Sequence, residues 1–327
     1  MFKALVLDQV DNKTIAEVRQ IDSSFLANED VLIDVEYSSI NYKDGLAITG
    51  LGRIVKNFPM IPGIDLCGRV ITSKDARYAA GDNVILTGWG VGESHSGGMA
   101  EKASLKGDWL VPLPKQLSPQ QAMMVGTAGL TAMLCVQALI DAGVSTEDGE
   151  ILVTGASGGV GTVAIVLLSE LGYKVVAASG RCKENQDLLL SLGAVRTISR
   201  ETLEEPARAL EKQLWAGAID TVGSKILAKV LAQMQYNGAV AACGLAGGFD
   251  LPSTVMPFIL RAVKLLGVDS VLCPYTKRVA AWQRLATLLP PRFYQQACHE
   301  ITLDEAIPYA TKIIQGEITG RTVIKIK

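Results

Sequence analysis

The sequence predicts an α/β protein that combines a doubly wound parallel sheet with a second, β-rich domain. The chain has 327 residues, about twice the length of a typical single domain. Short β-type runs broken by glycine and proline extend to about residue 120, and apolar strands alternate with helical segments after it. Hydrophobic residues make up 49% of the chain and charged residues 20%, which suits a large core.

The β-rich domain is predicted from short apolar runs without βαβ spacing. Its predicted strands include Lys3–Leu7, Val31–Tyr37, Gly68–Thr72 and Asn83–Thr87. The segment Ile318–Lys327 is again β-like, so we expect the end of the chain to return to this domain. The predicted domains are therefore 1–122 joined by 272–327, and 123–271 between them.

The second domain is predicted from strands and helices that follow one another regularly. Apolar residues at helical spacing predict a helix over Met123–Ala142. Because buried strands then alternate with helices, we expect a parallel sheet covered on both faces. The predicted strands are Ile151–Thr154, Lys174–Ser179, Ala218–Val222, Ala239–Cys243 and Leu265–Val271, and the predicted helices are Gly159–Leu171, Lys183–Leu192 and Ile226–Met234.

Composition argues against several classes of partner. The net charge of -2 offers no basic excess for nucleic acid. We expect no signal peptide, and glycine or charge is expected to break every apolar stretch short of the roughly 18 residues that span a membrane. The six cysteines stand singly, so we expect reduced thiols and a cytoplasmic protein.

The strongest local signal is a glycine-rich turn from Val153 to Gly161. It follows a predicted buried strand and opens a predicted helix, which is the context of a Rossmann dinucleotide fingerprint. Glycine lets the backbone approach a pyrophosphate, and the helix N-terminus attracts its charge. The predicted cofactor contacts in this turn are Ser157, Gly158, Gly159 and Val160.

The end of the second strand favours NADPH over NADH. An NAD site normally places an acidic residue there, whereas this chain has Ser179, Gly180 and Arg181. A guanidinium suits the dianionic 2′-phosphate, although an Arg in this position can also simply lie on an exposed loop. Arg200 follows the third strand and is expected to add to the same pocket.

The layout resembles the medium-chain dehydrogenase/reductase superfamily, in which a GroES-like domain precedes a Rossmann domain. Several long runs resemble its acrylyl-CoA reductase (YhdH-type) group. These runs are 41–44 (NYKD), 57–65 (NFPMIPGID), 86–93 (LTGWGVGE), 106–110 (KGDWL) and 243–248 (CGLAGG). The resemblance implies that residues 1–122 form a GroES-like catalytic domain and residues 123–271 an NADPH-binding domain.

The positions of the zinc ligands in this superfamily are changed. A cysteine is missing from the run at 40–44, and Ile64 stands where zinc enzymes have histidine. A catalytic zinc needs about three protein ligands, and this chain has only two histidines. We therefore expect an enzyme without metal.

The resemblance implies hydride transfer to the double bond of acrylyl-CoA, which gives propanoyl-CoA. Tyr42 is the main catalytic candidate because its phenol could stabilise the enolate or deliver a proton. It could equally pack beside the nicotinamide, with Asn41 and Asp44 orienting it or Asp44 capping a helix. His95 lies in a loop, and we interpret it as an ordinary polar residue rather than as an acid.

Further contacts are implied by resemblance alone. Leu245, Ile259 and Ser270 are expected to border the nicotinamide half of the cofactor, and Arg321 to lie where the superfamily closes the cleft. The partners expected are an acyl-CoA substrate and a second copy of the chain in a homodimer, with no nucleic acid or membrane. Basic residues available for the CoA phosphates are Arg53, Lys56, Arg261, Lys264 and Arg278.

Two other functions stay open at this point. The same zinc-free scaffold also serves NADPH:quinone oxidoreductases. A non-catalytic NADPH-binding redox sensor is the alternative from another class.

Overall fold

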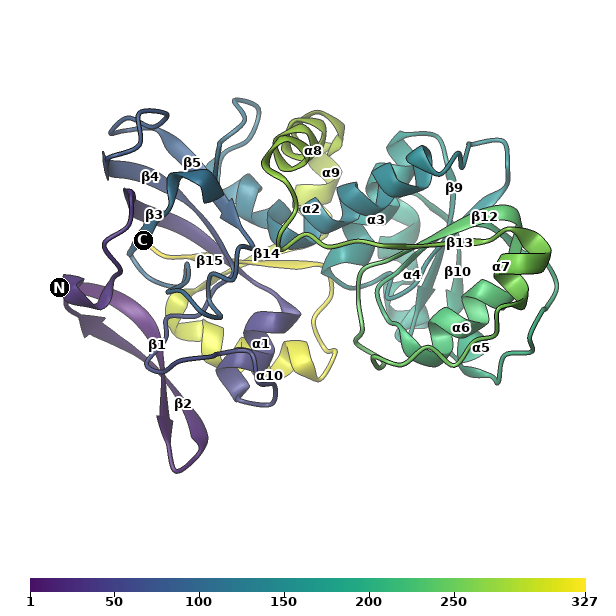
Figure 1. The fold of residues 1–327 in the computed structure, drawn as a ribbon, viewed down its shortest axis with the longest axis horizontal. Coiled ribbons are helices and arrows are strands. Elements are labelled where there is room, and N and C mark those ends of the chain that lie inside the picture. The colour runs from purple at the N-terminus through teal and green to yellow at the C-terminus, as the bar shows by residue number, and fades with distance from the viewer. The chain divides into compact units, whose positions relative to one another are not determined.

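The computed structural model describes residues 1–327, which form two compact units (Figure 1). Unit 1 contains Met1–Thr127, Ser270–Thr287 and Cys298–Lys327. Unit 2 contains Ala128–Asp269 and Leu288–Ala297. The functional domains predicted from the sequence, 1–122 with 272–327 and 123–271, stay a prediction, because compactness alone does not define a function.

Unit 2 is built on a six-stranded parallel sheet. Its strand order is β10-β9-β8-β11-β12-β13, in which the chain starts at the centre and winds outward in both directions. This is the doubly wound Rossmann order, so the predicted fold class is confirmed. The strands are β8 (Glu150–Val153), β9 (Lys174–Ser179), β10 (Ala194–Ser199), β11 (Trp215–Asp220), β12 (Met234–Ala242) and β13 (Lys264–Gly267).

The helices of unit 2 form because apolar residues recur at helical spacing between the strands. In α6, for example, Ile226, Leu227, Val230 and Leu231 are buried in one cluster with Leu152 of β8. Burying such side chains contributes roughly 1.5–3 kcal/mol each. The helices are α3 (Gly159–Glu170), α4 (Cys182–Ser191), α5 (Glu201–Glu204), α6 (Ser224–Ala232), α7 (Met256–Arg261) and α9 (Pro291–Gln296).

The helix α2 (Pro119–Asp141) corrects one expectation from the sequence. It is long and apolar enough to cross a membrane by length and composition, and 72% of its most apolar window is buried inside the protein. The expected break is absent because glycine, unlike charge, does not end an apolar run. The helix is nevertheless interrupted at Gly126, whose backbone is non-helical (φ 52°, ψ -158°).

Unit 1 contains a seven-stranded, mostly antiparallel sheet. The order is β14-β15-β3-β4-β5-β7, and β6 also pairs with β3. Strand β15 runs antiparallel to β3 with Thr322 opposite Ile40, which confirms that the segment near residue 320 returns to the first part of the chain. The strands are β3 (Val31–Ile40), β4 (Asp65–Ser73), β5 (Asn83–Thr87), β6 (Lys102–Leu105), β7 (Leu110–Pro112), β14 (Cys298–Thr302) and β15 (Arg321–Lys325).

The remaining elements of unit 1 pack around this sheet. A two-stranded antiparallel hairpin opens the chain, and helix α1 contacts helix α10. Alternating side chains of β3, including Val31, Ile33 and Val35, enter the central core, as the period-2 pattern predicts. These elements are β1 (Phe2–Val10), β2 (Lys13–Ile21), α1 (Tyr42–Thr49), α8 (Tyr275–Leu288), α10 (Ala306–Ile314) and the short 3-10 helices Ser23–Phe25, Gly107–Trp109 and Leu303–Glu305.

Candidate active site

The carboxyl edge of the unit 2 sheet carries the glycine-rich turn. β8 ends at Val153 and α3 begins at Gly159, with Gly158 at the N-cap. Ser157, Gly158, Gly159 and Val160 are partly exposed. The first backbone N–H groups of a helix have no partner within the helix, so this turn presents donors and the positive end of the helix dipole.

Two glycines of this turn are required by close packing. At Gly155, where φ is +58°, a Cβ atom would lie 2.1 Å from Thr221 Oγ1. At Gly161 a Cβ atom would lie 2.4 Å from the Gly155 carbonyl oxygen. A larger residue at either position would therefore push the turn away from the strand edge. The turn has the form that a pyrophosphate requires.

Ser179 joins the end of β9 to the glycine-rich turn. Its hydroxyl lies 3.0 Å from the Ser157 hydroxyl and accepts a hydrogen bond of 3.1 Å from the Arg181 backbone N–H. A Cβ atom on Gly180 would lie 2.9 Å from Arg200 Cζ, so Arg200 lies directly over this residue. The structure thus brings Ser157, Ser179, Gly180 and Arg200 together at one edge of the sheet.

Arg200 is not committed to the protein interior. Its side chain is 52% exposed and pairs at 2.8 Å with Glu204, one turn further along α5. An exposed pair of this kind contributes roughly 0.3–0.5 kcal/mol, so the guanidinium can exchange its partner for a phosphate at small cost.

A buried carboxylate supports the turn from below. Asp220, at the end of β11, accepts hydrogen bonds from Thr154 Oγ1 (2.7 Å) and the Gly223 N–H (2.7 Å). Burial raises the pKa of Asp220, and these hydrogen bonds oppose the rise. Asp220 was not among the residues predicted from the sequence, because Thr154, its side-chain partner, lies 66 residues away along the chain.

Three residues implied by resemblance lie in different settings. Leu245 follows β12 and is 66% exposed, and Ile259 in α7 is 73% exposed. Apolar side chains left this open are available for a ligand. Ser270 is buried and begins the segment with which the chain enters unit 1 again.

Tyr42 opens helix α1 directly after β3. Asn41 is the N-cap and Asp44 the N3 residue of a capping box, with the Asn41 N–H donating to Asp44 Oδ2 at 2.9 Å. Of the two roles left open for Asp44, the structure therefore shows the helix cap. Tyr42 itself is 43% exposed, and its hydroxyl makes no hydrogen bond within the protein. Its phenol is thus presented to solvent on a fixed helix terminus.

A buried polar network lies beside this helix terminus. Asp65 Oδ2 accepts hydrogen bonds from Ser39 Oγ (2.6 Å), Asn41 Nδ2 (2.8 Å) and the Thr127 N–H (3.0 Å). Arg321 Nη1 donates to Asn41 Oδ1 at 3.0 Å, and Arg321 Nε donates to the Met124 carbonyl at 3.0 Å. Asn41, the residue that precedes Tyr42, therefore makes hydrogen bonds with both buried charges.

Gly126 makes this network possible. A Cβ atom at Gly126 would lie 2.6 Å from Arg321 Nη2 and 2.7 Å from Asp65 Oδ2. Its left-handed backbone breaks α2 where the carbonyls of Met123 and Met124 turn toward the guanidinium. Arg321 was expected to bind the cofactor; in unit 1 its side chain is 3% exposed and contacts protein groups.

Asp44 is a second buried carboxylate of this region. Its Oδ1 accepts a hydrogen bond of 3.0 Å from the Ile64 N–H. Burial and the nearby charge of Asp65 raise the pKa of Asp44 to about 7, against the opposing effect of its hydrogen bonds. The charge of Asp44 therefore changes near neutral pH at the base of the helix that carries Tyr42.

His95 is held by its own loop. Its Nδ1 lies 3.0 Å from the Ser96 carbonyl, and its ring packs edge-on against Trp109 at 5.2 Å between centroids. These contacts fit the interpretation of His95 as an ordinary polar residue rather than as an acid.

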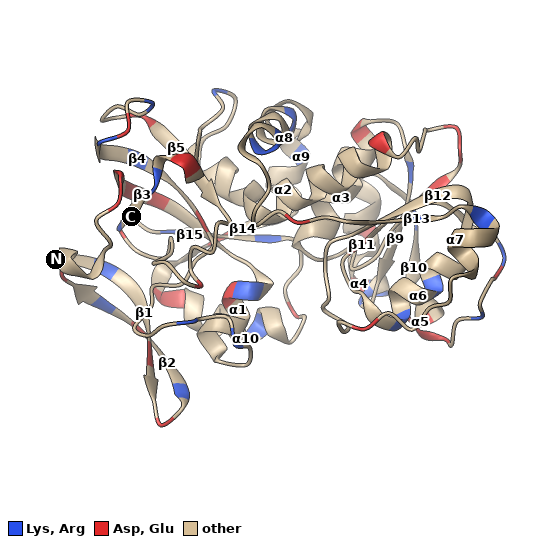
Figure 2. Cartoon of the chain, viewed as in Figure 1, with Lys and Arg blue, Asp and Glu red and all other residues tan.

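Two basic residues considered for CoA phosphates are in fact structural. Arg261 is buried and donates to the carbonyls of Ala232, Met234 and Glu211, and Arg278 is fully buried. The sequence could not show this, because an Arg that binds carbonyls has no distinctive pattern. Arg53 and Lys56 are exposed, and Figure 2 shows basic and acidic residues interspersed along both units.

The cysteines and the donor groups have ordinary surroundings. None of the six cysteines forms a disulfide bond, and burial raises the pKa of Cys67 and Cys298, the latter to about 12. No group of three or more His, Cys, Asp or Glu side chains is placed to hold a metal ion. Independence from metal stays a prediction.

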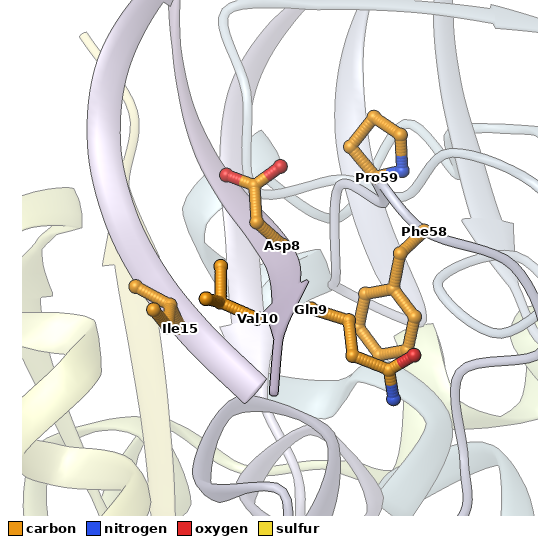
Figure 3. A pocket seen from close by; sticks show the side chains of 6 residues that line it. All are labelled: Asp8, Gln9, Val10, Ile15, Phe58 and Pro59. Atoms are coloured by element: carbon orange, nitrogen blue, oxygen red, sulfur yellow. The ribbon is translucent and has the colours of Figure 1, made fainter. Parts of the chain in front are cut away.

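A surface pocket lies away from these groups. It is lined by Asp8, Gln9, Val10, Ile15, Phe58 and Pro59 (Figure 3). Its one carboxylate, Asp8, pairs with Arg19 at 2.6 Å. None of the predicted site residues lines this pocket.

Comparison with known proteins agrees with this architecture. The family model for the alcohol dehydrogenase GroES-like domain matches residues 27–115, and that for zinc-binding dehydrogenases matches residues 159–287. With the Rossmann sheet and its glycine-rich turn, these matches define a medium-chain dehydrogenase/reductase.

More similar proteins narrow the assignment. The probable acrylyl-CoA reductase AcuI of Escherichia coli is 61% identical over 99% of both chains. The yhdH oxidoreductase of Salmonella enterica, solved in complex with NADP, is 60% identical with a TM-score of 0.98 over 99% of this chain and 100% of that one. The putative quinone oxidoreductase YhfP of Bacillus subtilis is 47% identical over 100% of this chain and 99% of its own. The present chain belongs to the acrylyl-CoA reductase (AcuI/YhdH) family, a family of oxidoreductases.

Proposed function

We propose that this enzyme uses NADPH to reduce the carbon–carbon double bond of acrylyl-CoA to propanoyl-CoA without a metal. The observation that carries the proposal is the 61% identity, over 99% of both chains, to a relative named probable acrylyl-CoA reductase. The site supports it, since Tyr42 is an exposed proton donor and the glycine-rich turn can receive a dinucleotide.

The residues of unit 2 fit NADPH. There is no room for a side chain at Gly155 or Gly161. The backbone of the turn therefore stays close to the strand edge, which leaves space for a pyrophosphate at the start of α3. Arg181 and Arg200 follow two adjacent strands, where a 2′-phosphate requires positive charge. The Salmonella relative was solved with NADP, whereas the Bacillus relative was solved with NAD. The preference for NADPH is therefore a property to be measured in this chain.

The protein residues have a limited task in this reaction. Bound NADPH supplies the hydride, which forms the new C–H bond at the β-carbon of the substrate. The electrons of the double bond then move toward the thioester carbonyl oxygen. The Tyr42 hydroxyl can donate a hydrogen bond to that oxygen and stabilise the enolate. A proton from Tyr42 or from water completes the reduction at the α-carbon.

The alternative with a specific observation behind it is a quinone oxidoreductase. The Bacillus relative carries that name at 47% identity. A quinone also accepts a hydride without a metal, so the same site would serve. A non-catalytic redox sensor has no such support, because the chain belongs to a family of reductases.

A steady-state assay of NADPH oxidation separates these functions. Acrylyl-CoA, crotonyl-CoA and a quinone are compared at matched concentrations, before and after dialysis against a strong chelator. We expect the highest kcat/KM with acrylyl-CoA, unchanged after dialysis. A higher kcat/KM with the quinone would favour the alternative. Stoichiometric zinc in the purified protein, with activity lost when dialysis removes it, would refute the metal-free reaction.

A further inference from the structure

Arg278, in the first turn of α8, is the largest fully buried side chain after Trp282, and it is 0% exposed. Its Nη1 donates to the Thr87 carbonyl at 2.6 Å and to Thr87 Oγ1 at 2.7 Å. Its Nη2 donates to the carbonyls of Ser270 (3.0 Å) and Val271 (3.1 Å). One guanidinium therefore joins the end of β5 to the segment Ser270–Cys273.

These two segments also contact each other directly. The Trp89 N–H donates to the Val271 carbonyl at 3.1 Å, and a Cβ atom on Gly88 would lie 2.8 Å from the same oxygen. Gly88 and Trp89 both have positive φ, 81° and 59°. For a tryptophan this backbone is costly, so surrounding contacts must hold it. The Arg278 guanidinium does so by covering the Trp89 ring at 4.9 Å.

A salt bridge connects the turn that begins at Gly88 to the helix that carries Tyr42. The Glu93 N–H donates to the Gly90 carbonyl at 3.2 Å within this turn. Glu93 Oε1 then pairs with Lys43 Nζ at 2.8 Å, and the Glu93 side chain is only 19% exposed. Lys43 is the neighbour of Tyr42 in α1. A continuous set of contacts thus connects Ser270–Cys273 to the helix terminus that presents the phenol.

We propose that Arg278 is a positioning residue for the reaction proposed above, which holds the turn 88–93 and Ser270–Cys273 in the one arrangement that places Tyr42 correctly. The inference rests on the proposed function for its catalytic readout, but not for its structural one. A lysine cannot replace this arginine. The planar guanidinium donates in two directions at once and stacks on an aromatic face, whereas an ammonium is a single point donor.

The variants Arg278→Lys and Thr87→Val test this proposal. Thr87→Val removes only the hydroxyl acceptor and keeps the carbonyl, so it remains informative if the first variant folds poorly. Ile33→Val, in the buried core of β3, is the matched control, because it loosens the core cluster that also contains Val91 but removes neither a hydrogen bond of the turn nor a contact of Arg278. Each protein is measured for kcat, KM for both substrates, and amide hydrogen exchange in residues 88–94 and 270–273.

We expect Arg278→Lys to lower kcat by about tenfold or more, because small displacements of a catalytic group have large kinetic effects. KM for NADPH should change less than kcat. Exchange should quicken in both segments, more weakly in Thr87→Val, while Ile33→Val keeps its kcat within about twofold and shows no selective change. Exchange in 88–94 that matches wild type, or a drop in kcat shared equally by Ile33→Val, would overturn the proposal.

The same experiment separates this inference from the proposed function. If the wild-type enzyme does not reduce acrylyl-CoA, the proposed function fails, and the exchange data alone decide whether Arg278 holds the turn. If the wild-type enzyme is active and Arg278→Lys shows normal exchange and normal kcat, only the role of Arg278 fails.

Discussion

Arg321 and Asp65 face each other inside unit 1, with Arg321 Nη2 4.0 Å from Asp65 Oδ2 and side chains that are 3% and 0% exposed. The two charges meet through Asn41 and Ser39 rather than in a close pair. This arrangement satisfies both buried charges with hydrogen bonds, which is the condition for tolerating them. It also holds Asn41, the N-cap residue of α1, by hydrogen bonds to both charged side chains.

The first prediction concerns this pair. Arg321→Met leaves the Asp65 carboxylate buried without its counter-charge, so the free energy of unfolding should fall by about 3–5 kcal/mol. The double variant Arg321→Met with Asp65→Asn should recover part of the loss, since the isolated charge is then gone. Denaturant titrations of the two single variants and the double variant measure the coupling. Strict additivity would contradict a direct interaction.

The second prediction concerns the hydroxyl of Tyr42. Tyr42→Phe keeps the ring and removes only the donor, so turnover should fall by roughly 10²-fold with KM for NADPH little changed. Tyr236→Phe, on an exposed position of β12, serves as the control. A nearly normal Tyr42→Phe enzyme would show that the ring only packs beside the cofactor. In that case Tyr42→Ala should weaken NADPH binding instead.

The third prediction concerns the choice of cofactor. Losing one charged hydrogen bond costs roughly 1.5–3 kcal/mol, so Arg181→Ala should raise KM for NADPH about tenfold or more. KM for NADH should stay nearly constant, because NADH has no 2′-phosphate. Arg196→Ala is the control, since Arg196 instead pairs with Glu150 at 2.6 Å. Equal changes for the two cofactors would remove Arg181 from the phosphate pocket.

The fourth prediction concerns pH. The pKa of Asp44 is raised from 3.8 to about 7 in the folded protein, so between these values the native state binds more protons than the unfolded state. The Asp44 contribution to stability is therefore present at low pH and is lost as pH rises toward 7. Asp44→Asn removes this titration. The melting temperature of the variant minus that of wild type should increase from pH 4.5 to pH 8, and a constant difference would show that Asp44 is not the titrating group.

The fifth prediction concerns assembly. β13 is the edge strand of the unit 2 sheet. The N–H of Val268, directly after β13, donates to the Ala242 carbonyl of β12. Successive residues of a strand direct their N–H groups to opposite sides. The N–H of Gly267 therefore points away from β12, where a second copy could pair. We expect a two-fold homodimer, and Gly267→Pro should dissociate it while leaving the β12 ladder intact. Light scattering decides; a wild-type monomer at every concentration would reject the dimer.

The sequence predicted most elements of the dinucleotide-binding unit because their signals are local. β9 has the predicted bounds, and α3 differs from its prediction by one residue at its end. β11 was predicted to begin three residues too late and to end two residues too late, because Thr221 and Val222 were interpreted as strand. Hydrophobic period and turn residues are enough to identify such elements.

The catalytic side could be predicted only in part. The motif around Tyr42 was recognised from the sequence. The residues of the buried network that holds its neighbour Asn41, which are Asp65, Thr127 and Arg321, lie far away in sequence. Nothing local marks a residue as buried and hydrogen-bonded across a sheet. For the same reason Arg278 was counted among the basic residues available for the CoA phosphates, although it is fully buried.

The position of β15 has a consequence for biosynthesis. Residues Arg321–Lys325 form an interior strand of the unit 1 sheet, between β14 and β3. During translation, Val31–Asp34 of β3 can pair early with β6, whereas Tyr37–Ile40 leave the ribosome long before their partner β15 exists and stay unpaired along that edge. The strands of unit 2 are contiguous along the chain and can close their own sheet earlier. Nascent chains should thus acquire a folded dinucleotide-binding unit first, and chaperones should protect the N-terminal strands until β15 emerges.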